Sequence, residues 1–123
     1  MTALASSTQE LVVRFRDAAI RKGKGNFPAR VDHELHRAMS EAFWALEEQG
    51  QPGREAFRSL LLDESPEVRS WVAAQLLSEG ESGARFTLEQ LRREHGMLGL
   101  DAEAVLREHA SGRLESPFGK RGA

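Results

Sequence analysis

Residues 32–36 are the segment of this chain whose composition comes closest to that of a metal site. His33 and His36 are three residues apart, so a helix places them side by side on one face. Two imidazoles with a carboxylate such as Asp32 would suit zinc or nickel. In the zinc-hydrolase motif, however, the histidines are four residues apart and a glutamate lies between them. We therefore expect a solvent-facing polar helix face and no cofactor, although a fortuitous surface metal site is compatible with the same spacing.

The sequence lacks the residue patterns of nucleophilic catalysis. It contains no cysteine, which excludes a thiolate zinc site, a cysteine nucleophile and a disulfide scaffold. None of its serines lies in a Gly-x-Ser-x-Gly turn. His95 and His109 lie near the expected ends of two helices, where a positive charge is favourable. We expect that the protein is not an enzyme.

Residues 21–25 form a basic, glycine-containing segment at the end of the first expected helix. Residues 11–30 contain six basic and one acidic side chain, a net charge of +5. The segment has neither the spacing nor the Gly-Lys-Ser/Thr ending of a phosphate-binding loop. We expect a flexible turn between two helices. The alternative is a binder of nucleic acid or of another acidic surface that uses Arg21, Lys22 and Lys24.

The rest of the chain is acidic and favours a basic partner. Residues 31–115 contain nine basic and seventeen acidic side chains, a net charge of −8. Trp44 follows Phe43 and lies off the main apolar stripe, which fits either packing between helices or a partly exposed interface anchor. We expect a partner-binding surface formed by Trp44 with acidic residues on the polar sides of three helices: Glu41, Glu48, Glu67 and Glu103.

Six helices are expected to position these residues. Apolar residues recur at three- and four-residue steps, and glycines and prolines interrupt the pattern. The expected helices begin near Ser7, Pro28, Gly53, Pro66, Gly83 and Asp101. They end near residues 22, 49, 62, 79, 95 and 111.

The length of 123 residues fits one ordinary domain. We expect a helical domain over residues 7–112, a loose N-terminus over residues 1–6 and a flexible tail over residues 113–123, because both ends lack periodicity. No apolar run is long enough to span a membrane, and the N-terminus lacks the features of a secretory signal. We therefore expect a cytoplasmic protein with no membrane partner.

Residues 61–77 resemble a HEAT-type repeat. In that pattern, an aspartate and a proline, here Asp63 and Pro66, form the turn between two helices. The following Val68 packs inward, and Arg69 lies across the turn. Over residues 8–114 the chain is similar to the short bacterial HEAT-like proteins of the domain-of-unknown-function family numbered two thousand and nineteen. The resemblance implies an all-α fold and no established activity, and the basic segment at residues 21–25 departs from it.

These observations predict an all-α, short HEAT-like right-handed stack of about three antiparallel helix pairs. A curved surface without a catalytic arrangement is typical of a protein-binding module. By analogy with small bacterial helical-repeat proteins, the function predicted is that of an immunity protein. Such a protein neutralises a cognate toxin domain by stoichiometric binding. The acidic surface would suit a basic toxin domain, and nucleic acid is the alternative partner.

Overall fold

The computed structural model describes residues 2–120, and within this range the chain is all-α with no β-strand. The prediction of an all-α fold is therefore confirmed. The chain divides into two compact units, the first up to Ser59 and the second from Leu60. A single domain over residues 7–112 stays a prediction.

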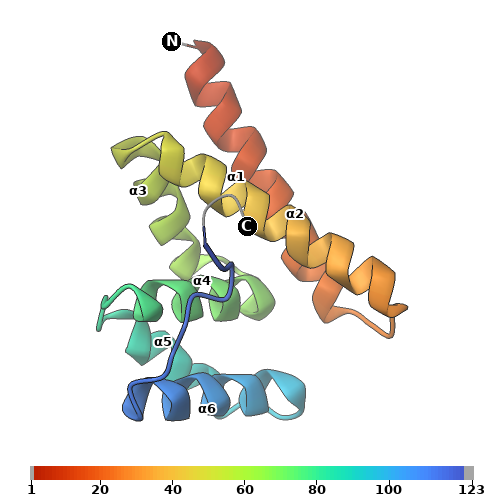
Figure 1. Cartoon of the computed structure of the whole chain (residues 1–123), viewed down its shortest axis with the longest axis vertical. Helices are drawn as coiled ribbons and strands as arrows, with labels where there is room; N and C mark the ends of the chain where they lie inside the picture. Colours follow the sequence, from red (N-terminus) through yellow and green to blue (C-terminus); the bar gives the residue numbers. More distant parts are fainter. Residues whose placement is uncertain (1, 121–123) are drawn as a thin grey trace. The chain divides into compact units, whose positions relative to one another are not determined.

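The first unit consists of an antiparallel helix pair and a third, shorter helix. Helix α1 (Thr2–Gly23) and helix α2 (Ala29–Glu48) run side by side, and α3 (Gln51–Ser59) follows α2 (Figure 1). Each helix contributes one fully buried phenylalanine to a shared cluster. The ring of Phe57 lies 5.3 Å from that of Phe15 and 4.8 Å from that of Phe43, both edge to face. Such pairs stabilise a core beyond the area that they bury.

A glycine allows α3 to approach α2 closely. A Cβ atom on Gly53 would lie 1.8 Å from the backbone oxygen of Leu46, which is shorter than any non-bonded contact permits. Only glycine therefore fits at this position. Gly50, with a φ of 75°, forms the turn that separates the two helices.

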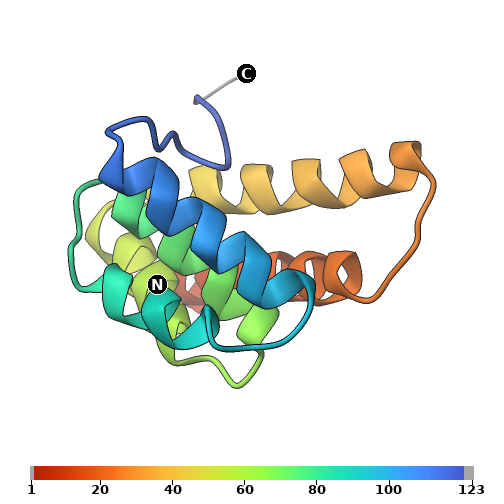
Figure 2. The ribbon, with the colours of Figure 1, turned by 90° about the horizontal axis from the view of Figure 1, so that it is seen from below.

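The second unit is built around one helix whose middle part is buried on all sides. It contains the short 3-10 helix η1 (Leu60–Leu62) and three α-helices, α4 (Pro66–Ser78), α5 (Ala84–Leu91) and α6 (Met97–Ala110). Six consecutive residues of α4, residues 72–77, are buried. Helices α5 and α6 lie side by side against α4 (Figure 2). A helix segment with buried residues on every side needs cover from several neighbouring elements.

The turn before α4 is held by its own side chains, as the repeat pattern predicts. The Asp63 carboxylate accepts a hydrogen bond from the Ser65 N–H at 3.0 Å, and the Ser65 hydroxyl accepts one from the Val68 N–H at 3.3 Å. From the far side, Arg69 Nη1 donates to the backbone oxygen of Asp63 at 2.6 Å. The predicted start of α4, with Ser65 as cap and Pro66 in the first turn, is confirmed.

The structure corrects the expectation of a flexible tail for the part that it describes. Residues 113–118, which we call the strap, run from the end of α6 across α4 (Figure 1). Phe118 is only 4% exposed, and the Ser116 hydroxyl donates a hydrogen bond to the Gln75 side chain. The strap is ordered because side chains bind it to α4, and such contacts leave no periodic signal. Residues 121–123 lie outside the described residues.

Two expected helix starts and one expected helix end are wrong. Helix α1 begins at Thr2, so Ser7 lies inside the helix and is no cap. Helix α5 ends at Leu91, four residues before the expected end. Helix α6 begins at Met97, because Gly99 lets its first turn approach the Glu94 backbone oxygen so closely that a Cβ atom would lie 2.0 Å away. The expected cap Asp101 therefore lies within α6.

We predict that Gly53→Ala lowers the free energy of unfolding by about 1–3 kcal/mol, the usual cost of overpacking a filled site. The added methyl group must displace the Leu46 carbonyl and hence the start of α3. Urea denaturation followed by circular dichroism measures the change. Gly83→Ala is the control, because its Cβ would meet open space and its φ is −60°, so the shift should stay below about 1 kcal/mol. Equal midpoints for both variants would contradict the close approach.

We predict that Asp63→Ala lowers the free energy of unfolding by about 1–2 kcal/mol, because the Ser65 N–H loses its acceptor and the turn before α4 loosens. The neighbouring variant Glu64→Ala removes an exposed side chain and leaves the backbone oxygen that Arg69 contacts. It should therefore be nearly neutral. The structural role of Asp63 is refuted if its removal is as mild as that of the Glu64 carboxylate.

Candidate functional site

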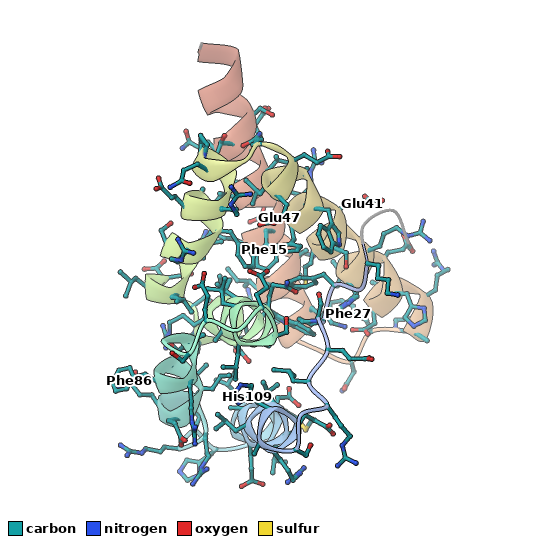
Figure 3. All side chains as sticks on the ribbon, turned by 60° about the vertical axis from the view of Figure 1, so that its left-hand side comes forward. Phe15, Phe27, Glu41, Glu47, Phe86 and His109 are labelled. Atoms are coloured by element: carbon teal, nitrogen blue, oxygen red, sulfur yellow. The ribbon has the colours of Figure 1, made fainter. Side chains whose placement is uncertain are left out.

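Three of the five predicted partner-binding residues form one row on the outer side of α2. Residues 41, 44 and 48 are spaced by three and four positions, which places them along one face of the helix. Glu41 and Glu48 are exposed and Trp44 is partly exposed. Figure 3 shows Glu41 on the side of α2 away from Phe15. We call Glu41, Trp44 and Glu48 the α2 row.

The core fixes the position of the indole in this row. The apolar stripe of α2 faces inward, and Phe43 is almost completely buried within it. The Trp44 ring lies 4.8 Å from the Phe43 ring in an edge-to-face arrangement. Because Phe43 also packs on Phe57, the indole rests on a rigid aromatic cluster while part of it stays exposed between two carboxylates. A preorganised aromatic side chain of this kind is what interface anchors require.

The other two predicted residues lie in the second unit and already have partners there. Glu67, in the first turn of α4, accepts a hydrogen bond from the Ser65 hydroxyl at 3.1 Å. Glu103 lies 3.8 Å from Arg107 on the next turn of α6. Glu67 therefore has a role at the start of α4, and Arg107 partly neutralises the charge of Glu103. Neither residue adds a carboxylate to the α2 row.

The basic segment is partly neutralised within the first unit. Lys22 Nζ donates a hydrogen bond to Asp32 Oδ2 at 2.7 Å, and the lysine side chain is only 15% exposed. This hydrogen bond holds the pKa of Asp32 below its ordinary value. Of the three predicted basic residues, Arg21 and Lys24 are exposed. Lys22 ties the end of α1 to the start of α2.

The two histidines lie near the start of α2. His33 is exposed and His36 is partly exposed on the first half of α2. In the part of the chain that the structure describes, no three histidine, aspartate or glutamate side chains are placed to hold a metal ion. Within the same range, no helix is both long and apolar enough to cross a membrane.

Sequence reasoning missed one polar site on α4. Gln75 is 2% exposed and is the one buried polar side chain among the described residues. Its amide nitrogen donates to Glu79 Oε2 at 2.6 Å, and its oxygen accepts from the Ser116 hydroxyl at 2.5 Å. The signal that could have found it is Phe118, an isolated large apolar residue in an otherwise polar tail.

Comparison with known proteins identifies no relative: no protein-family model, no curated protein and no solved structure matches this chain. The resemblance to the short HEAT-like family therefore stays a prediction.

We predict that Asp32→Asn lowers the free energy of unfolding at pH 7 by at most about 1 kcal/mol, as expected for a partly exposed ion pair. A lowered pKa means that this contribution is present above the ordinary aspartate pKa of about 4 and is lost as the pH falls through the lower, folded value. The difference from the wild type should therefore shrink at low pH. Urea denaturation at pH 7 and near pH 3 measures both values.

Asp17→Asn is the control for this pH dependence, because Asp17 is an exposed aspartate on α1. Its replacement should have little effect at either pH. If the Asp32 and Asp17 variants follow the same pH profile, the Lys22–Asp32 pair does not stabilise the helix junction.

Proposed function

We propose that this protein is a non-enzymatic, HEAT-like helical-repeat module that binds a basic protein stoichiometrically. The proposed arrangement is a short right-handed stack of about three antiparallel helix pairs. By analogy with small helical-repeat proteins that lack a catalytic site, the proposed role is an immunity protein that neutralises a cognate toxin domain. A basic nuclease domain is the kind of partner that an acidic surface would suit.

The α2 row is the observation that carries this proposal. It combines a partly exposed tryptophan, fixed by the aromatic core, with carboxylates three residues before it and four residues after it. Tryptophan is among the residues most enriched at energetic hot spots of protein interfaces. The flanking carboxylates give the surface its preference for lysine or arginine side chains, which also stack favourably on an indole.

The placement of the candidates on separate helices supports a smaller site than the sequence suggested. Lys22 is paired with Asp32, so of the three predicted basic residues only Arg21 and Lys24 are exposed. Glu67 and Glu103 are engaged with Ser65 and Arg107. We place the proposed binding surface on the α2 row because it brings three of the five predicted residues together on one helix face. Nucleic-acid binding through Arg21 and Lys24 is the alternative outcome of the test.

We predict that Glu41→Lys/Glu48→Lys slows association with the partner about tenfold or more and weakens its salt dependence, because rim charges act mainly on the association rate. The partner is first captured from the native host on the immobilised wild-type protein and identified. Association of the purified partner is then measured at several salt concentrations. Folding stability should change little, because both side chains are exposed.

Glu10→Lys/Glu94→Lys is the matched control. It makes the same change in net charge at two exposed glutamates outside α2. An equal loss in both double variants would mean that only the overall charge matters. Loss of binding on replacing Arg21 and Lys24 with alanine, with the α2 variant unaffected, would favour the basic-segment alternative.

A further inference from the structure

The strap is bound to α4 by two anchors that lie two residues apart. Ser116 donates its hydroxyl hydrogen to the buried Gln75 oxygen, and Phe118 packs its ring beside Trp71 with a centroid distance of 6.0 Å. Trp71 and Gln75 are four residues apart on α4, so they lie on one face of the helix. We call the side chains of Trp71 and Gln75 the strap site.

The first anchor is selective because Gln75 is buried. Its amide nitrogen donates to Glu79, and its oxygen accepts a hydrogen bond from the Ser116 hydroxyl. A segment that covered the Gln75 oxygen without a donor would leave it buried and unsatisfied, which is unfavourable. Any segment that replaces the strap must therefore supply a hydrogen-bond donor at the position of Ser116.

The second anchor is prepared by the strap itself. The Phe118 N–H donates to the Ser116 hydroxyl oxygen at 3.2 Å, so one hydroxyl joins a local turn to the contact with α4. This turn sets the distance between the hydroxyl and the aromatic ring. Pro117, between them, restricts the backbone and reduces the entropy lost on binding.

The strap has no regular secondary structure beyond the end of α6. Gly112, with a φ of 76°, turns the chain out of α6, and Arg113 closes that helix end by donating to the Glu108 oxygen at 2.9 Å. Residues 114–118 belong to no helix. The flanking residues Glu115, Gly119 and Lys120 are exposed. The strap is thus held as a short peptide ligand is held, by side chains in a fixed site.

We propose that the strap site is a peptide-recognition site that the chain's own strap occupies. Its ligand is a segment of a partner protein that carries a hydroxyl residue two positions before a phenylalanine, as in the strap's own Ser-Pro-Phe. Such a segment displaces the strap and satisfies both Gln75 and Trp71. The partner binds only molecules whose strap is open, so its apparent affinity falls in proportion to the fraction of open molecules. This inference concerns α4 and is independent of the α2 row.

The test measures binding of a fluorescent synthetic peptide of residues 114–120 to full-length protein by anisotropy. In the variant Phe118→Ala the chain's own strap loses its aromatic anchor. We expect this variant to bind the peptide about tenfold or more tightly than the wild type does, because the competing strap is weakened. On the same variant, peptides with alanine in place of the serine or of the phenylalanine should bind at least about tenfold more weakly.

Phe86→Ala is the matched control, because Phe86 is 67% exposed and points outward from α5 in Figure 3. It should bind the peptide as the wild type does. Circular dichroism verifies the folding of each variant, and Ser116→Ala replaces Phe118→Ala in the comparison if the latter does not fold. Equal peptide affinity of the folded strap variant and the wild type would overturn the proposal. So would a strap-mediated dimer of the wild type that the peptide dissociates, since the site would then serve a second copy of the chain.

Discussion

The burial of the middle of α4 is the constraint on which the second unit depends. Its six consecutive buried residues point to all sides of the helix, so neighbouring elements must cover this part all round. Helices α5 and α6 provide much of that cover, and the strap provides another part through Phe118. The same burial explains why Gln75 requires two hydrogen-bonding partners: an unsatisfied amide inside such a unit would be unfavourable.

Local signals predicted the parts of the fold that local interactions determine. Ser65 and Pro66 mark the start of α4, and the apolar period of α2 predicts its bounds to within one residue, because caps and periodicity act over a few positions. The start of α6 could not be predicted in this way. It depends on the approach of Gly99 to the Glu94 carbonyl, and a glycine at that place in the sequence reads equally well as part of a loop. The strap was missed for a related reason, since Ser116 and Gln75 are 41 residues apart.

For the candidate site, the shared face of Glu41, Trp44 and Glu48 follows from their helical spacing, because one helix carries all three. It did not show which charges are already paired. The contact of Lys22 with Asp32 depends on how the chain turns between α1 and α2, and the hydrogen bond from Ser65 to Glu67 depends on the cap of α4. Counting charges along the sequence therefore overstated the number of groups that are open to a partner in both the acidic and the basic sets.

The two tryptophans are divided between the two units, with Trp44 beside Phe43 in the first and Trp71 beside Phe118 in the second. The chain has no tyrosine, so its intrinsic fluorescence comes almost entirely from these two indoles. Each one is an optical reporter of its own unit. Replacing either with phenylalanine leaves a single emitter, and a comparison of the two denaturation curves then shows whether the units melt together or in separate transitions.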